Sequence, residues 1–167
     1  MPNKMKYIWQ NQIKRGEIMK TCFFIGHRDA PESAASALRA AVERHIIEYG
    51  VTAFVVGHYG NFDRLAAAAV IAAKAAYPHI TLTLLLPYHP AVQPIDVPRG
   101  FDDSCYPTGL EGVPRHVAIP QANRYAVEHA DYLIAYSRYA ASNARRIVNY
   151  AQRRGIPVYN LAHESPR

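Results

Sequence analysis

The amino-acid sequence predicts an α/β domain with an open, doubly wound, Rossmann-like parallel sheet of about five strands and helices on both faces. Short apolar segments alternate along the chain with longer segments whose apolar residues recur at helical spacing. The short segments are apolar throughout, which is typical of parallel strands buried on both faces. The length of 167 residues suits one domain, and the hydrophobic share of 50% argues against extensive disorder.

The first predicted strand and helix follow a short basic segment. Residues 21–26 (TCFFIG) form an apolar run closed by glycine, which predicts a buried strand. Residues 33–49 carry apolar side chains at helical spacing, and Gly50 predicts the end of that helix. Asp29 and Glu32 have the spacing of a capping box ahead of the helix.

The second unit repeats this order. Residues 51–57 (VTAFVVG) predict another buried strand, and the alanine-rich residues 62–76 predict a helix that ends before Pro78. Residues 80–88 (ITLTLLLPY) predict the third strand.

The second half of the chain is less regular. Residues 89–120 are rich in proline, glycine and aspartate, which predicts a long loop that acts as a lid or binding loop. Helices are then predicted at 121–130 and 142–154, and the fourth and fifth strands at 131–137 and 156–161.

The charge of the chain is uneven. The formal net charge is +6, and most of the excess lies in the first 20 residues. Residues 1–18 are therefore predicted to be a basic extension, and residues 19–167 a single domain. A second basic region lies near the C-terminus, at Arg138, Arg145, Arg146, Arg153 and Arg154. Both regions are compatible with nucleic-acid binding, although a solvated helix face is the favoured interpretation.

Cysteine content and hydropathy exclude several classes of protein. Cys22 and Cys105 are too few for a disulfide scaffold and lack the CxxC spacing of zinc sites. No segment approaches the roughly 20 apolar residues of a membrane span, and the N-terminus lacks the apolar core of a signal peptide. We expect a cytoplasmic protein without a membrane partner.

The predicted topology locates a ligand site. In open parallel sheets, ligands bind beyond the carboxyl ends of the strands, where loops and helix N-termini meet. The first four predicted strands end in His27-Arg28, in GHYGNFD at 57–63, in Tyr88-His89 and in Ser137-Arg138. We expect these segments to share one rim of the sheet.

The turn GHYGNFD at 57–63 is the most informative of these segments. Gly57 and Gly60 lack Cβ atoms, so a ligand can approach the backbone there. The helix that follows directs free N–H groups at the same space, which suits phosphate or another anion. Asp63 stands in the first turn of that helix, where a carboxylate can cap the helix or accept hydrogen bonds from ribose hydroxyls.

Other polar residues follow the strands. Arg28 is a fork-shaped donor suited to phosphate or carboxylate, and it can equally pair with a nearby acid on the surface. His27, His58 and His89 each follow a predicted strand, but nothing in the sequence brings them within ligand distance of one ion, so no metal site is predicted.

Several segments together resemble a known superfamily. They are FFIGHR at 23–28, GHYGNFD at 57–63, YPTGLEGVP at 106–114 and IPQANRYAVEHADYLIAY at 119–136. In this order they are similar to a bacterial branch of the SLOG superfamily of Rossmann-like proteins, which includes DNA-processing protein A and the LOG phosphoribohydrolases. The resemblance covers about residues 20–162 and implies nucleotide-derived ligands at the rim. It implies these rim residues: Gly26, His27, Arg28, Gly57, Gly60, Asp63, Glu111 and Asn123.

The chain also departs from that superfamily. Ala122-Asn123 stands where relatives have Arg-Asn, and Ser142-Asn143 replaces a Gly-Gly pair that cradles phosphate. Ser142 and Asn143 can still cap a helix, and Arg145 nearby can hold an anion. No acid follows where the LOG enzymes place their catalytic glutamate.

The preferred functional hypothesis is binding or sensing of a nucleotide or nucleotide-derived small molecule. The predicted ligand-binding residues are Gly26, His27, Arg28, Gly57, His58, Gly60, Asp63, Asn123, Ser142, Asn143 and Arg145. No cofactor is predicted with certainty.

Two alternatives remain open, and so does the question of whether the protein is an enzyme. In the first, the protein is an N-glycosidic hydrolase or transferase in which Glu111 is catalytic, unless Glu111 only pairs with Arg115. In the second, the protein binds DNA through residues 1–18 and the arginine-rich last helix. By analogy with relatives, we also expect a homo-oligomer.

Overall fold

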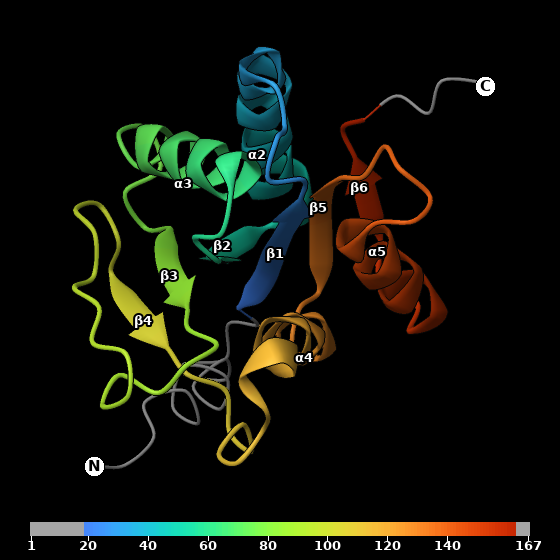
Figure 1. Ribbon diagram of the computed structural model, residues 1–167. Coiled ribbons are helices and arrows are strands. Elements are labelled where there is room, and N and C mark those ends of the chain that lie inside the picture. Colours follow the sequence, from blue (N-terminus) through green and yellow to red (C-terminus); the bar gives the residue numbers. More distant parts are fainter. Residues whose placement is uncertain (1–18, 163–167) are drawn as a thin grey trace.

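The structure, a computed structural model, describes residues 19–162 and contains a six-stranded parallel sheet (Figure 1). The strands are β1 (Lys20–Gly26), β2 (Val51–Val56), β3 (Thr81–Leu85), β4 (Asp103–Cys105), β5 (Tyr132–Tyr136) and β6 (Val158–Asn160). The helices are the 3-10 turn η2 (Glu32–Ala34), α2 (Ala35–Tyr49), α3 (Asn61–Ala73), α4 (Arg115–Glu128) and α5 (Asn143–Arg153). The predicted extension at residues 1–18 lies outside the described residues.

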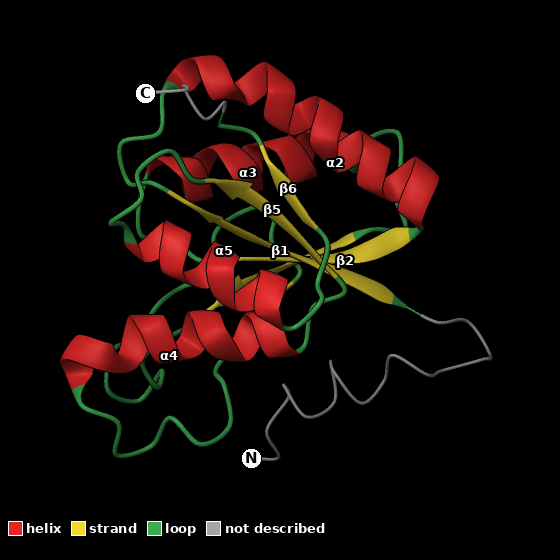
Figure 2. Cartoon of the chain, turned by 90° about the vertical axis from the view of Figure 1, so that its right-hand side faces the viewer, coloured by secondary structure: helices red, strands yellow, loops and turns green. Residues whose placement is uncertain are grey.

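The strand order is β4-β3-β2-β1-β5-β6, so the chain winds outward from the centre in both directions. All neighbouring pairs are parallel. Helices α2 and α3 cover one face of the sheet, and α4 and α5 cover the other (Figures 1 and 2). The predicted open, doubly wound α/β class is confirmed. The direction of winding reverses between β1 and β5, which is where ligands bind in such sheets.

Alternation along the strands separates two core layers. In β1, Cys22 and Phe24 pack into the layer under α2 and α3, whereas Phe23 packs into the layer under α4 and α5. Phe24 stacks on Phe54 of β2, with ring centroids 5.8 Å apart, and both rings are fully buried. A central sheet buried on both faces explains why these strands are apolar throughout.

The predicted number of strands was one too low. Strand β4 lies inside residues 89–120, which were predicted to be one loop, and it pairs with β3 through Asp103, Ser104 and Cys105. Its three residues are too few and too polar to give a strand signal in the sequence.

The long loop is also shorter than predicted because α4 begins at Arg115 rather than at residue 121. Pro120 lies inside this helix, in its second turn, and a proline at that point favours a prediction that starts the helix after it. The proline removes only one backbone N–H from the helical hydrogen-bond ladder, so the remaining turns keep their hydrogen bonds.

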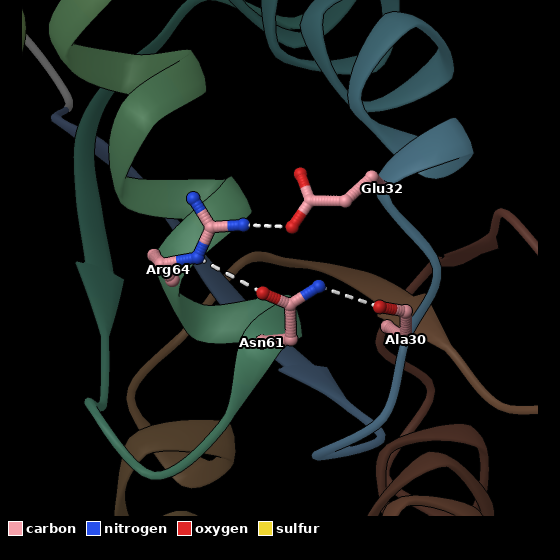
Figure 3. A network of polar contacts seen from close by, with 4 residues as sticks. All are labelled: Ala30, Glu32, Asn61 and Arg64. Carbon is pink, nitrogen blue, oxygen red and sulfur yellow. Dashed lines mark hydrogen bonds and ion pairs between the residues drawn. The ribbon is translucent and has the colours of Figure 1, made fainter.

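The helix ends were predicted with mixed success. Gly50 ends α2 with a φ of 69°, and the Ser142 hydroxyl caps α5 by accepting a hydrogen bond from the backbone N–H of Arg145. The capping box was wrong, because no side chain caps η2. Glu32 instead pairs with Arg64 of α3 (Figure 3).

Candidate functional site

A cavity of about 210 Å³ opens at the carboxyl ends of β1, β2 and β3, facing α4 and the first turn of α5. Its walls therefore come from both halves of the doubly wound sheet. Among the predicted site residues, it is lined by Gly26, His27, Arg28, Gly57, Asp63, Asn123 and Asn143. The lining does not include His58, Gly60, Ser142, Arg145 or Glu111.

Gly60 lies outside the cavity lining, where the loops after β1 and β2 touch. A Cβ atom on Gly60 would lie 2.5 Å from the Cα of Arg28, so only glycine permits this approach. The backbone N–H of Asn61 donates to the carbonyl of Arg28 at 2.9 Å, and Asn61 Nδ2 donates to the carbonyl of Ala30 at 2.6 Å. Arg64 Nε in turn donates to Asn61 Oδ1 at 2.9 Å (Figure 3). These bonds fix Arg28 relative to the start of α3.

Asp63 holds the turn before α3 and also lines the cavity. Its Oδ2 accepts the backbone N–H of Tyr59 at 3.0 Å, which holds the turn before α3, and the same residue lines the cavity. Gly57 makes room for this carboxyl group, because a Cβ there would lie 3.1 Å from Asp63 Oδ2. Burial raises the pKa of Asp63 to about 6, against the opposing effect of the Tyr59 hydrogen bond.

His27 joins the end of β1 to the end of β5. Its Nε2 accepts the backbone N–H of Arg138 at 2.8 Å, so the proton of the neutral ring is on Nδ1. The buried ring also contacts Tyr139, with ring centroids 4.8 Å apart. Burial lowers the pKa of His27, which keeps the ring neutral near pH 7.

We expect His27 and His45 to lower the free energy of unfolding as the pH falls below about 6.5, while Asp63 contributes in the opposite direction. Burial lowers the pKa values of His27 and His45 in the folded state, so the unfolded chain binds more protons in this pH range and is favoured by acid. Urea denaturation at pH 5, 6 and 7 measures this dependence. The pH dependence should be weaker in His27→Gln than in the wild-type protein. Equal slopes in the wild-type protein and His27→Gln would contradict the assignment of a neutral, hydrogen-bonded His27.

The N-terminus of α5 forms another wall of the cavity. Asn143 and Ala144 line it, directly after the capping residue Ser142. Arg145 Nη2 donates to the carbonyl of Ser137 at 3.0 Å, so this guanidinium stabilises the position of the backbone after β5. The side chain of Asn160 makes two more hydrogen bonds to Ser137, at its N–H and its carbonyl.

Several lining residues were not predicted from the sequence. They are Phe24, Ile25, Tyr59, Leu85, Pro87, Ile119, Ala122 and Ala144. Tyr59 lies within the glycine turn and was accessible to prediction from its position. The apolar residues carry no sequence signal for a ligand site, because apolar strand ends and apolar helix faces are expected wherever a core exists.

Arg115 connects the loop after β3 to helix α4, outside the cavity lining. Its Nη2 donates to Gln93 Oε1 at 3.0 Å, and its guanidinium lies 4.8 Å from the ring centroid of Tyr88. Glu111 does not pair with Arg115 in the structure. The exposed Glu111 accepts the backbone N–H of Gly109 at 3.1 Å, outside the cavity lining.

His58 is exposed and its ring contacts Tyr59, with ring centroids 4.4 Å apart. Within residues 19–162, no group of three or more histidine, cysteine or acidic side chains is arranged to hold a metal ion. None of the helices in that part of the chain is long and apolar enough to cross a membrane.

Comparison with solved structures places the fold. No protein-family model and no curated protein sequence matches this chain. DNA processing protein A from Streptococcus pneumoniae superposes with a TM-score of 0.60 at 16% identity, over 84% of this chain and 49% of that protein. This chain therefore spans about half the length of the Streptococcus pneumoniae protein.

Two further structures have the same arrangement. A molybdenum cofactor binding protein from Rippkaea orientalis superposes with a TM-score of 0.57 at 15% identity, over 84% of this chain and 74% of that protein. DNA processing protein A from Helicobacter pylori, described with a single-stranded DNA binding mode, has a TM-score of 0.57 at 16% identity, over 83% of this chain and 63% of that protein. The Rossmann-like fold implied by the SLOG resemblance is thereby confirmed.

Proposed function

We propose that this protein binds a nucleotide or nucleotide-derived small molecule in the cavity at the carboxyl rim of the sheet. The observation that carries the proposal is that a cation, a helix N-terminus and a half-buried carboxyl group all line one cavity. The cation is Arg28, the helix N-terminus is that of α5 at Asn143, and the carboxyl group is that of Asp63.

The anion-binding end is formed by Arg28 and α5. Within the described part of the chain, the Arg28 guanidinium forms no ion pair, although it carries a permanent positive charge. The first backbone N–H groups of α5 lie at Asn143 and Ala144, and a helix N-terminus favours negative charge. Together they form a suitable site for a phosphate group.

Apolar side chains supply the rest of the cavity. Leu85 and Pro87 lie on the β3 side, and Ile119 and Ala122 lie on α4. Apolar walls of this kind suit a heterocyclic base. The volume of about 210 Å³ is below the roughly 300–1,000 Å³ of pockets for drug-sized ligands, so the enclosed part holds a small ligand or one moiety of a larger one.

Titration calorimetry with AMP, ADP, ADP-ribose and NAD tests the proposal. We expect at least one of these compounds to bind, and Arg28→Gln to weaken that binding tenfold or more because the phosphate loses its charged donor. Arg39→Gln is the matched control, since Arg39 is exposed on α2 outside the cavity. No binding of any compound, or equal affinity in both variants, would contradict the proposal.

Nucleic-acid binding is a second candidate, favoured by a group of arginines on α4 and α5. The guanidinium carbons of Arg124, Arg153 and Arg154 lie 4.6, 5.9 and 5.8 Å from the ring centroid of Tyr150. All three arginines are exposed, and none forms an ion pair with a residue between 19 and 162. The nearby acid Glu128 accepts a hydrogen bond from the Tyr150 hydroxyl at 2.5 Å. Such a surface can neutralise phosphates of a nucleic-acid strand.

Fluorescence anisotropy with a labelled thymidine 20-mer at several salt concentrations tests this candidate. If phosphates contact this surface, Arg153→Gln combined with Arg154→Gln should weaken binding at all salt concentrations and reduce the salt slope by about 1 to 2. Replacing Arg39 and Arg99 by glutamine keeps the same net charge as the test variant and serves as the control. An equal effect of both double variants would show that only overall charge matters.

A further inference from the structure

Asp63 has one carboxylate oxygen without a protein partner at the wall of the cavity. Its Oδ2 is engaged with the backbone N–H of Tyr59, and Oδ1 accepts no hydrogen bond from the residues that the structure describes. A half-buried carboxyl group with an open acceptor is costly in the empty protein, because burial penalises its ionised form. A ligand that donates hydrogen bonds to Oδ1 would offset that cost.

The surroundings of Asp63 indicate which kind of donor fits. The polar groups that share the cavity are His27 and Arg28 after β1, Tyr59 in the preceding loop, and Asn123 and Asn143 on α4 and α5. His27 is neutral near pH 7, and burial raises the pKa of Tyr59 to about 12, so Arg28 is the charged neighbour. A cationic ligand group would meet Arg28 and the N-terminus of α5, which both repel positive charge. Neutral hydroxyl donors avoid this repulsion.

We propose that Asp63 selects ligands that carry a pair of adjacent hydroxyl groups, such as the 2′,3′-diol of a ribosyl unit, and holds that pair while the phosphate lies toward Arg28 and α5. One hydroxyl donates to Oδ1, and the second donates to the remaining lone pair of Oδ2. The apolar walls at Pro87 and Ile119 then take the base. This inference rests on the proposed nucleotide-binding function and adds to it the orientation and the sugar specificity.

The position of Asp63 in the chain supports this assignment. It lies in the first turn of α3, after the loop that follows β2, so its carboxyl group is held at the carboxyl rim of the sheet. Gly57 leaves the space that this carboxyl group occupies. The turn before α3 would therefore serve the sugar rather than the phosphate.

The test compares AMP with 2′-deoxy-AMP and 2′,3′-dideoxy-AMP by titration calorimetry on the full-length protein. We expect the dideoxy compound to bind the wild-type protein at least tenfold more weakly than AMP. In Asp63→Asn, which keeps an oxygen for the Tyr59 N–H, this discrimination should fall below threefold. Asp96→Asn, with an exposed carboxyl group outside the cavity lining, should retain the wild-type discrimination.

A second readout reports on the carboxyl group itself. Hydroxyl donors stabilise the ionised form, so AMP should release more protons at pH 6 than dideoxy-AMP, by up to about half a proton. Titrations in two buffers of different ionisation enthalpy measure this difference, and the phosphate contribution cancels between the two ligands. The difference should vanish in Asp63→Asn.

The outcomes separate this inference from the proposed function. Equal binding of AMP and dideoxy-AMP, with Arg28→Gln still weakening both, would overturn the role of Asp63 and leave nucleotide binding intact. If none of the nucleotides binds the wild-type protein, both proposals fall. Loss of discrimination in Asp96→Asn as well would show that the effect does not arise in the cavity.

Discussion

Gly26→Ala is expected to destabilise the protein by about 1–3 kcal/mol and to abolish ligand binding. A Cβ atom at position 26 would lie 2.3 Å from Cγ of Phe62, and that ring is fully buried in the first turn of α3. The ring cannot move aside without shifting the turn that carries Asp63 into the cavity. Urea denaturation measures the loss of stability, and calorimetry with AMP measures the loss of binding.

A double-mutant cycle checks the physical cause. Phe62→Ala alone is expected to cost about 3–5 kcal/mol, because it leaves a cavity in the core. In that background Gly26→Ala should cost less than in the wild-type protein, since the contacts with the ring are gone and only the contact with Cβ at 2.8 Å remains. Equal costs in both backgrounds would show that the clash with Phe62 is not the reason for glycine at position 26.

Asp63→Asn is expected to stabilise the ligand-free protein at pH 7 by about 1–3 kcal/mol. The pKa of Asp63 is raised from its ordinary value near 4 to about 6, and one pKa unit corresponds to about 1.4 kcal/mol. A raised carboxyl pKa means that the folded state binds more protons than the unfolded state between pH 4 and 6. Stability therefore falls as the pH rises through that range, and the neutral amide avoids the loss.

The difference in unfolding free energy between Asp63→Asn and the wild-type protein should follow the titration of this carboxyl group. It should approach zero below about pH 3, where the carboxyl group is protonated in both the folded and the unfolded protein, and reach its maximum above about pH 6. The histidine contribution has the opposite sign and is common to both proteins. A difference that stays constant from pH 4 to 7 would mean that the ionised Asp63 is not destabilised in the folded protein. A gain in stability with a loss of ligand discrimination is the pattern expected of a functional residue.

The sequence was sufficient for the fold class because this sheet is buried on both faces. Phe23 and Phe24 belong to opposite core layers, so the strand has no polar face, and apolar runs between helices predict a parallel sheet. Strand β4 was not predicted because it lies at the edge of the sheet, where a polar residue such as Ser104 is tolerated. Its three residues are also too few to show a periodic pattern of apolar side chains. The start of α4 was misplaced because the backbone tolerates Pro120 in an early helical turn.

The candidate site was predictable only where the chemistry is local. Gly57 and Asp63 are separated by one turn, so their proximity follows from the chain itself. The hydrogen bond from the Arg138 N–H to His27 joins residues 111 positions apart, and no local sequence pattern predicts it. Glu111 shows that a resemblance can also mislead. The segment around it resembles a superfamily motif, but the Glu111 side chain lies outside the cavity lining.

The shared walls of the cavity have a consequence for assembly of the chain. Arg28 and Asp63 come from the half of the sheet that winds through β2 and β3, whereas Asn123 and Asn143 come from the half that continues through β5. A molecule bound there bridges two pieces of polypeptide and gains affinity only after they have docked. If the backbone is cut between residues 109 and 112, the two fragments should reassociate more tightly when a nucleotide is present. A ligand would then hold the two fragments together, and an increase in the protease resistance of the mixed fragments would detect its binding.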